Sequence, residues 1–336
     1  MSVTKVVIVG LGNIGQGVLS ARSLFPDIEV TGIFSRRAAE IGQSVDGVRV
    51  YALNKGTSLE DFDADVAILC GGSRTDLPEW GPRLARNINT VDSFDTHDHV
   101  GPWNDSAGNL QIGYLAEMHE AASHNGFLAD VGIGWDPGLF SNRRAEFTAC
   151  LGKETKVYAF YGLTARGGLS MGHSDAIRRV KHVADARSYT HARPEAIELV
   201  RSGANPHLSH GEMHWRECFV AVEPWAVYED VQQAIVSMPN YFAPYETKVH
   251  FVDRSVIYAD HQEQYHDGLV LAVSDVGLME YRNVWHSNPQ ATARIMLATA
   301  RAVERMNDDG RTGAITALDI PAKFLCADMG QAVSLV

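Results

Sequence analysis

The sequence predicts an α/β protein with two domains, the first built on a parallel sheet with helices on both faces and the second of mixed α+β structure. The chain has 336 residues, 45% of them hydrophobic, which is enough for two separate cores. Apolar runs alternate with helix-like segments up to about residue 150, and longer alternating runs follow. We therefore expect a first domain at 1–150, completed by the C-terminal segment 287–336, and a second domain at 151–286.

The first domain is expected to alternate regularly between strands and helices. Each apolar run ends in glycine or polar residues, as buried parallel strands do. The expected strands are KVVIV at 5–9, IEVTGIF at 28–34, DVAILC at 65–70, INTVD at 88–92 and FLADV at 127–131, with helices within 13–25, 77–87 and 113–124. This order predicts crossover connections and hence a parallel sheet.

The second domain is expected to hold a mixed or antiparallel sheet with helices on one face. Its expected strands are KVYAFYGL at 156–163, CFVAVE at 218–223, ETKVHFVDRSVIY at 246–258 and GLVLAVSDVG at 268–277, and its expected helices lie at 193–203 and 228–238. A last helix is predicted to begin at Pro289, directly after Asn288, which is a suitable N-cap. We expect this helix to return to the first domain.

Composition narrows the functional classes. The net charge of −12 weighs against a general nucleic-acid or anionic-membrane surface. No apolar run approaches the ~20 residues of a membrane span, and no cationic start precedes an apolar run at the N-terminus. The four cysteines are scattered without a CxxC pair, which is typical of reduced thiols. A cytoplasmic protein is expected.

A glycine-rich turn lies between the first expected strand and helix. Gly10, Gly12 and Gly15 have the GxGxxG spacing, in which the glycines permit the tight turn, the approach of a pyrophosphate and close helix packing. Within a complete βαβ unit this pattern predicts a Rossmann dinucleotide-binding domain. The intervening Leu11, Asn13 and Ile14 are expected to contact the cofactor as well.

The end of the second strand indicates which dinucleotide is bound. An NAD-preferring site places a carboxylate there for the ribose hydroxyls, whereas this chain has Ser35, Arg36 and Arg37. Guanidinium groups attract a 2′-phosphate, so NADP is the predicted cofactor.

The later strands of the first domain should end at the crevice that holds the reactive part of the cofactor, because ligands of open α/β sheets lie outside the carboxyl ends of the strands. Trp135 and Asp136 lie at such an end, and Asp136 is also suited to cap a helix that Pro137 begins. The remaining expected cofactor contacts at these ends are Cys70, Gly71, Gly72, Ser73, Ser93, Phe94, Asp95 and Gly134.

Several segments together resemble the meso-diaminopimelate dehydrogenase family. They are VGLGNIG, GIFSRR, VDSFD, GWDPGLFS, MGHSDAIRR, MPNYF and SNP, in family order over nearly the whole chain. The resemblance implies an NADP-dependent homodimer that oxidises the D-centre of meso-diaminopimelate to an imine, which hydrolyses to L-2-amino-6-oxopimelate and ammonia. That reaction belongs to lysine and diaminopimelate biosynthesis.

The resemblance also implies roles for individual residues. Asp95 and Asp136, the expected catalytic residues, fall where the family holds the reacting D-amino group. Thr190, Arg216, His266 and Asn288 fall where it holds the distant L-amino acid end, and Trp135, Tyr161, Met171 and Gly172 complete the expected substrate contacts. Three features depart from the family pattern: Met171 where Gln is frequent, a longer loop in YGLTARGGLSMGHS, and YHDG in place of PHGG.

Hydride removal from an amine leaves an iminium cation, which the carboxylates of Asp95 and Asp136 would stabilise. Either could also take a proton or activate the hydrolytic water, and the sequence does not assign which. Two other functions stay open: a broad D-amino-acid dehydrogenase, favoured by Met171, and a non-catalytic NADP-binding sensor. No metal is expected, although His207, His210 and His214 have helical spacing, because Gly211 interrupts them and a fourth ligand is missing.

Overall fold

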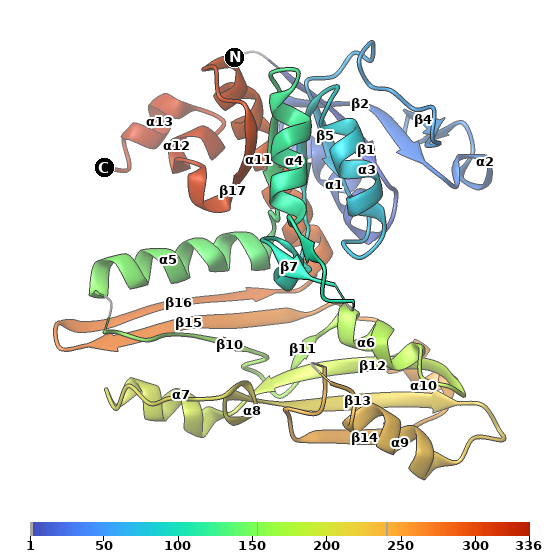
Figure 1. Cartoon of the computed structure of the whole chain (residues 1–336), viewed down its shortest axis with the longest axis vertical. Coiled ribbons are helices and arrows are strands. Elements are labelled where there is room, and N and C mark those ends of the chain that lie inside the picture. The colour runs from blue at the N-terminus through green and yellow to red at the C-terminus, as the bar shows by residue number, and fades with distance from the viewer. Residues whose placement is uncertain (1–2, 106, 153, 240) are drawn as a thin grey trace. The chain divides into compact units, whose positions relative to one another are not determined.

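The computed structural model describes residues 3–105, 107–152, 154–239 and 241–336 (Figure 1), so Asn240 of the MPNYF segment lies outside the described residues. The chain divides into two compact units, one formed by 1–142 together with 289–336 and the other by 143–288. The boundaries expected from the sequence were 150/151 and 286/287. The first structural boundary falls instead within the helix Phe140–Leu151.

The first unit contains an eight-stranded sheet in the order β17-β9-β6-β5-β1-β2-β4-β3. Its central pairs are parallel, and the short β3–β4 pair at its edge is antiparallel. The strands are β1 (Thr4–Val9), β2 (Ile28–Ser35), β3 (Ser44–Val45), β4 (Val48–Ala52), β5 (Val66–Leu69), β6 (Asn89–Asp92), β9 (Leu128–Val131) and β17 (Gly313–Thr316). A separate two-stranded hairpin pairs β7 (Trp103–Asn104) with β8 (Leu110–Gln111). The predicted parallel α/β fold of this unit is confirmed.

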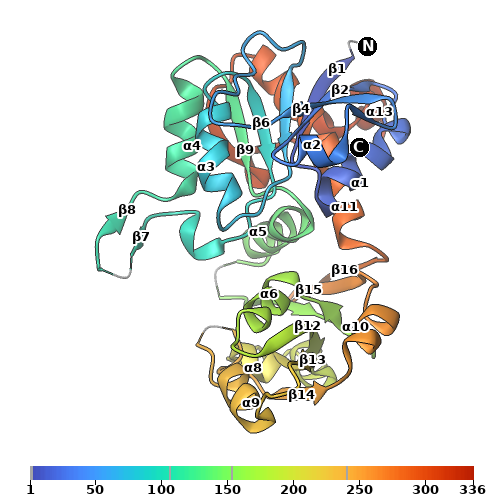
Figure 2. The same ribbon diagram turned by 90° about the vertical axis from the view of Figure 1, so that its right-hand side faces the viewer.

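Helices cover both faces of this sheet because successive side chains of its strands point to opposite sides. Val6 and Ile8 of β1 join a core with the helices α1 and α11, whereas Val7 and Val9 join a core with α3 and α4. Figure 2 shows α3 and α4 beside β6 and β9. The helices are α1 (Asn13–Ala21), α2 (Ala38–Ile41), α3 (Asp76–Leu84), α4 (Tyr114–Ser123), α11 (Asn288–Asp308), α12 (Ala322–Leu325) and α13 (Met329–Val333), with 3-10 turns at Arg22–Leu24, His97–His99 and Ala317–Asp319.

The C-terminal segment completes the first unit. Helix α11 packs its buried Ala293, Met296 and Leu297 into the core on the α1 side, and β17 extends the sheet beyond β9. A buried ion pair joins Arg301 of α11 to Asp27, with the guanidinium Nη2 donating to Oδ1 at 2.6 Å. Residues nearly three hundred positions apart are therefore parts of one core.

The second unit contains two sheets rather than the single one expected. A three-stranded antiparallel sheet has the order β10-β15-β16, and a four-stranded sheet has the order β11-β12-β13-β14 with β13 and β14 parallel. The strands are β10 (Val157–Tyr161), β11 (Gly168–Leu169), β12 (Val183–Ala192), β13 (His214–Val222), β14 (Thr247–Phe251), β15 (His266–Ser274) and β16 (Gly277–Trp285), and the helices are α5 (Phe140–Leu151), α6 (Met171–Arg178), α7 (Pro194–Arg201), α8 (His210–Met213), α9 (Tyr228–Val236) and α10 (Arg254–Asp260).

One expected strand of the second unit was wrong in its second half. The run at 246–258 was expected to be extended throughout, but β14 ends at Phe251 and α10 begins at Arg254. Asp253 has the extended backbone of an N-cap residue, which ends the strand and starts the helix. Ile257 is buried through the helix rather than through a sheet face.

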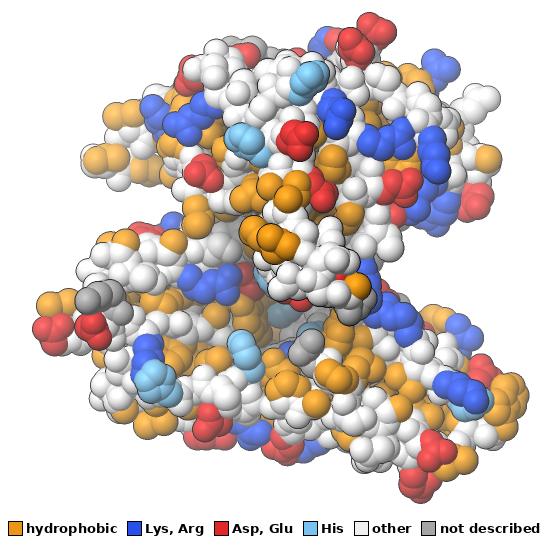
Figure 3. Space-filling model, in the orientation of Figure 1, with side chains coloured by type: hydrophobic (Ala, Val, Ile, Leu, Met, Phe, Trp, Pro, Cys, Tyr) orange, Lys and Arg blue, Asp and Glu red, His pale blue; other side chains and the backbone are white. Residues whose placement is uncertain are grey.

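Acidic and basic side chains are interspersed on the face shown in Figure 3. Within the described part of the chain, no helix is both long and apolar enough to span a membrane.

Candidate cofactor and substrate sites

The glycine-rich turn runs from the end of β1 into α1. Gly10 has a φ of +97°, and a Cβ there would lie 3.3 Å from the carbonyl carbon of Cys70. A Cβ on Gly15 would lie 2.0 Å from the carbonyl oxygen of Gly10, so only glycine allows α1 to approach β1 this closely. A Cβ on Gly12, the N-cap of α1, would meet nothing within 4 Å. The chain at the start of α1 is therefore open on the side of Gly12, which leaves room for a phosphate at the helix N-terminus.

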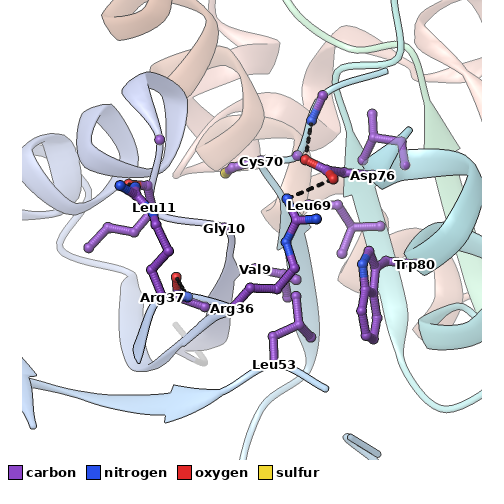
Figure 4. A pocket seen from close by; sticks show the side chains of 15 residues that line it. Val9, Gly10, Leu11, Arg36, Arg37, Leu53, Leu69, Cys70, Asp76 and Trp80 are labelled. Atoms are coloured by element: carbon purple, nitrogen blue, oxygen red, sulfur yellow. Dashed lines mark hydrogen bonds and ion pairs between the residues drawn. The ribbon is translucent and has the colours of Figure 1, made fainter. Parts of the chain in front are cut away.

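A cavity of about 370 Å³ opens beside this turn (Figure 4), which is within the range of ligand pockets. Nine of the residues expected at the cofactor line it: Gly10, Leu11, Gly12, Ser35, Arg36, Arg37, Cys70, Gly71 and Gly72. The lining also includes residues that the sequence analysis did not select, namely Val9, Leu53, Leu69, Asp76, Leu77 and Trp80. Of the other expected contacts, Asn13, Ile14 and Gly15 lie in the first turn of α1, and Ser73, Ser93, Phe94, Asp95 and Gly134 lie beyond the ends of β5, β6 and β9.

The two arginines at the end of β2 differ in their contacts. The guanidinium of Arg36 forms an ion pair with Asp76 across the cavity at 2.8 Å, and these side chains point toward one another in Figure 4. Arg37 reaches the carbonyl oxygen of Leu11 at 3.5 Å. The second oxygen of Asp76 accepts a hydrogen bond from the amide of Gly72 at 3.1 Å. The cavity thus combines the two cations Arg36 and Arg37 with the carboxylate of Asp76, which is the first residue of α3.

The ends of β5 and β6 are joined through Ser73. Its hydroxyl accepts a hydrogen bond from the amide of Asp95 at 3.0 Å and lies 3.5 Å from the carbonyl oxygen of Ser93. The side chain of Asp95 is exposed, and Phe94 beside it is buried. The expected residues Ser73, Ser93 and Asp95 are therefore brought together at one edge of the sheet.

The segment after β9 does not form the helix start expected at Pro137, so that prediction was wrong. Asp136, Pro137 and Gly138 have non-helical backbone angles, and the regular helix α5 begins at Phe140. Gly138 has a φ of +127°, which side-chain-bearing residues rarely adopt. Trp135 is buried and its ring lies 4.9 Å from that of Phe140. Asp136 therefore lies in an irregular turn rather than at a helix cap.

In the second unit, Arg216 of β13 pairs with Thr190 of β12 in the strand ladder. The guanidinium donates a hydrogen bond to the Thr190 hydroxyl and lies over the ring of Tyr245 at 4.2 Å. Arg216 is only 7% exposed, its Nε has no partner, and no Asp or Glu among the described residues forms an ion pair with it. Burial lowers the pKa of this guanidinium. Burial of a cation is costly unless an anion pairs with it, and the described residues supply no such anion to Arg216.

Two histidines are close to this cation. Burial, together with the positive charge of Arg216, lowers the pKa of His173 and of His214 to about 3, so both rings are neutral at ordinary pH. The Nε2 of His214 accepts a hydrogen bond from the amide of Tyr161 at 3.0 Å. His173 contacts the Ser170 hydroxyl at 2.6 Å through Nδ1. Neither histidine was among the expected substrate contacts.

His266 joins the same cluster through the strand β11. A Cβ on Gly168 would lie 2.7 Å from the His266 ring, and Gly168 pairs with Thr190 in the ladder. The rings of Tyr161 and His266 are 6.4 Å apart, edge to face. The structure therefore brings together four of the expected substrate residues, namely Tyr161, Thr190, Arg216 and His266, and adds His173, His214 and Tyr245.

The other expected residues of the second unit lie at element ends. Met171 and Gly172 open α6, with the Met171 side chain 41% exposed. Asn288 opens α11, and its amide donates to the carbonyl oxygen of Gln264 at 2.9 Å. Asp95, Trp135 and Asp136 belong to the first unit.

The histidine-rich segment 207–214 does not form one helix. Only His210–Met213 is helical, and His214 is already part of β13. In the described ranges, no group of His, Cys, Asp and Glu has the arrangement of a metal site.

The fold and the first cavity define a Rossmann-type protein of the class that binds a phosphorylated dinucleotide, with a buried guanidinium in the second unit. The family model of the diaminopimelic acid dehydrogenase C-terminal domain matches residues 134–287. The chain is 40% identical over 330 residues to the meso-diaminopimelate D-dehydrogenase of Lysinibacillus sphaericus, covering 97% of this chain and 96% of that protein. It is 36% identical over 329 residues to that of Corynebacterium glutamicum, covering 97% and 96%. The chain belongs to the meso-diaminopimelate D-dehydrogenase family, and the resemblance of its motifs is confirmed.

Solved structures give the same result. The C. glutamicum DAP dehydrogenase in complex with DAP superposes with a TM-score of 0.87 at 34% identity, covering 99% of each chain. An engineered D-amino acid dehydrogenase bound to NADP+ superposes with a TM-score of 0.83 at 33% identity, again covering 99% of each chain. The predicted combination of a Rossmann unit with a mixed α+β unit is therefore confirmed over the whole length.

Proposed function

We propose that this protein catalyses the NADP-dependent oxidative deamination of the D-centre of meso-2,6-diaminopimelate to L-2-amino-6-oxopimelate and ammonia, and the reverse reductive amination. The product cyclises to tetrahydrodipicolinate, an intermediate of lysine biosynthesis. The observation that carries the proposal is the buried guanidinium of Arg216, which has no carboxylate partner in the described part of the chain. A substrate with a carboxylate far from its reacting centre would supply the missing anion.

NADP is the cofactor, and the residues of the first unit fit it. The open space at Gly12 and the start of α1 would receive the pyrophosphate, and Arg36 and Arg37 would hold the 2′-phosphate. When bound, the nicotinamide supplies the acceptor for the hydride. The other contacts we propose are Gly10, Leu11, Asn13, Ile14, Gly15, Ser35, Cys70, Gly71, Gly72, Ser73, Ser93, Phe94, Asp95 and Gly134.

The carboxylates of Asp95 and Asp136 are proposed to act at the substrate nitrogen. Hydride loss turns a neutral amine into an iminium cation, so carboxylates beside the nitrogen stabilise the charge as it develops. One of the two takes a proton or activates the hydrolytic water. Trp135, which is buried beside Phe140, shields this end of the substrate from water.

At the other end, Arg216 and Thr190 are proposed to bind the remote carboxylate, with Tyr161, His266 and Asn288 completing the L-amino acid site. The rings of His173 and His214 are neutral because both pKa values are about 3, so neither adds a positive charge beside Arg216. Met171 and Gly172 border the site at the start of α6. Binding at this end places the D-centre for reaction.

We infer that the protein works as a cytoplasmic homodimer with small molecules as its ligands. Exposed apolar side chains of the β15–β16 hairpin, Val276, Leu278 and Val284, support a subunit contact on that sheet. The net charge of −12 weighs against nucleic acid and anionic membranes as partners. The described cysteines are free thiols, as in a reducing compartment.

A broad D-amino-acid dehydrogenase on the same scaffold is the second candidate. The exposed Met171 thioether supports it, because a thioether demands no hydrogen bond from the substrate. A non-catalytic NADP-binding sensor is less well supported, since it would have no use for a buried arginine that forms no ion pair with a described Asp or Glu.

The test is NADP+ reduction by the purified protein with the separate meso, LL and DD isomers of diaminopimelate. We expect turnover of the meso isomer and none of the LL isomer, which has no D-centre. Equal turnover of meso and LL would overturn the assignment of the D-centre. Binding of NADP without turnover of any isomer would favour the sensor.

A further inference from the structure

Asp92, the last residue of β6, is fully buried, and no role was assigned to it from the sequence. One carboxylate oxygen accepts hydrogen bonds from the amides of Phe94 at 2.9 Å and Gly132 at 3.0 Å. The other accepts a hydrogen bond from the hydroxyl of Tyr114 at 2.8 Å. A fully buried carboxylate that accepts three hydrogen bonds is a fixed structural element rather than a surface contact.

The two amides belong to the two segments that carry the proposed catalytic residues. Phe94 directly precedes Asp95, and Gly132 begins the turn that leads to Asp136. The carbonyl oxygen of Asp92 also accepts a hydrogen bond from the amide of Ile133 at 2.7 Å. One residue therefore binds the backbone of both segments.

The two segments are also in direct contact. Gly132 has a φ of +73°, and a Cβ there would lie 3.1 Å from the carbonyl oxygen of Phe94. Phe94 stacks on the ring of Tyr114 at 4.2 Å, so the third donor to Asp92 is itself packed against this segment. Neither segment can shift without breaking a bond to the Asp92 carboxylate.

We propose that Asp92 is a positioning residue of the reaction, which holds the backbone of 93–95 and 132–136 in register and so sets the placement of Asp95 relative to Asp136. The inference rests on the proposed function, because it needs those two carboxylates to act at the substrate nitrogen. Displacement of a catalytic group by about 1 Å can cost on the order of a hundredfold in rate. Loss of the Asp92 carboxylate should therefore lower turnover without removing the cofactor pocket, whose lining does not include Asp92.

The neighbouring strand offers a matched control. Asp130 of β9 is as completely buried as Asp92, but its carboxylate is bonded to neither Phe94 nor Gly132 among the described residues. Substitution of Asp130 measures the cost of removing a buried carboxyl group from this sheet. Any further loss of kcat in the Asp92 variants is then attributed to the missing hydrogen bonds from Asp92 to the two segments.

The experiment compares wild type with Asp92→Asn, Asp92→Ala and Asp130→Ala for kcat and KM with meso-diaminopimelate, for NADP affinity by fluorescence titration, and for Tm. We expect Asp92→Ala to lower kcat by about a hundredfold with NADP affinity within about threefold of wild type. Asp92→Asn should retain kcat within about fivefold, because its amide oxygen can still accept from both backbone amides. Asp130→Ala should leave kcat within about threefold, whatever its effect on Tm.

Three outcomes would overturn the inference: wild-type kcat in Asp92→Ala, equal losses in Asp92→Asn and Asp92→Ala, or an equal loss in Asp130→Ala. If Asp92→Ala does not fold, Asp92→Ser takes its place, since a hydroxyl can accept from one of the two amides. Failure of both to bind NADP would also count against the inference, because Asp92 would then support the whole fold. Wild-type protein that turns over no isomer would instead contradict the proposed function.

Discussion

Replacement of Arg216 by Met tests the proposed substrate site most directly, because Met keeps much of the apolar stem and removes the charge. The remote carboxylate of meso-diaminopimelate would lose its charge-assisted pairing with the guanidinium, which corresponds to about 2 to 4 kcal/mol. That loss predicts a fall in kcat/KM of roughly 30- to 900-fold. D-lysine, which lacks the second carboxylate, should lose much less.

The same substitution should cost the fold little. Arg216 has no carboxylate partner among the described residues, so its removal leaves no protein anion unpaired. The cation–π contact with Tyr245 and the bond to Thr190 are lost, and a buried charge is removed in return. We expect Tm to change by only a few degrees.

The assay measures kcat/KM for meso-diaminopimelate and D-lysine in wild type, in Arg216→Met and in the control Arg187→Met. Arg187 lies on the adjacent strand β12 and forms an ion pair with Asp185 at 3.0 Å, away from the proposed site. The Arg187–Asp185 pair is largely buried, so the control should lose stability, but kcat/KM of the folded control should stay within about threefold of wild type for both substrates. Equal losses for the two substrates in Arg216→Met would refute the reasoning and leave Arg216 with a structural role only.

The remaining predictions concern the cofactor, the reacting centre, substrate breadth and pH. Arg36→Asp should lower the preference for NADP over NAD by roughly tenfold to a hundredfold, as measured by both affinities, and an unchanged ratio would contradict the cofactor assignment. Asp95→Ala and Asp136→Ala should each depress turnover while fluorescence titration shows near-normal NADP affinity; normal turnover would remove that residue from the catalytic site. Wild-type protein should aminate simple 2-keto acids weakly with NADPH and ammonia, and Met171→Gln should reduce this activity; its complete absence in wild type would contradict the role of Met171. Burial lowers the pKa of His214 to about 3, whereas an unfolded His titrates near 6.5, so below pH 6.5 the unfolded chain binds a proton that the folded chain does not. Wild type should therefore lose up to about 1.4 kcal/mol of unfolding free energy per pH unit below 6.5, relative to His214→Gln. Parallel pH profiles of the two proteins in chemical denaturation would exclude this.

The parallel unit was predictable because its signals are local. Buried strands such as Val66–Leu69 read as short apolar runs, and the glycine spacing at 10, 12 and 15 lies within one βαβ unit, where Gly15 is required by its contact with Gly10. The start of the last helix was predicted at Pro289, one residue after the Asn288 at which α11 begins, because a suitable cap and a proline are adjacent in sequence.

The strand β12 was missed because its sequence is not clearly apolar. Asp185 and Arg187 interrupt it, and their ion pair within the fold compensates for the charges. Whether a charged residue in a strand finds such a partner depends on the tertiary structure, which propensity does not describe.

The substrate cluster was predicted in part, through the family motifs. Arg216 and Thr190 matched those motifs, whereas the contact of Arg216 with Tyr245 comes from the segment after α9 and has no sequence signature. The ion pair of Arg36 with Asp76 was also missed. Arg36 follows β2 and Asp76 begins α3, and these elements come close because β2 and β5 both lie beside β1 in the sheet. The failed helix cap at Asp136 arose from treating Pro137 as a helix start, although Gly138 allowed the chain to turn first.

The return of α11 and β17 to the first unit limits how far this unit can fold during translation. The ribosome releases β1 to β9 well before α11 and β17, so the α1-side core of the nascent sheet stays uncovered and its β9 edge unpaired until residues 288–316 emerge. Asp27 meanwhile lacks the guanidinium that neutralises it in the finished fold. A chain that stops short of residue 288 would expose an apolar sheet face and a free strand edge, two features that promote aggregation. The first unit can therefore finish folding only late in translation.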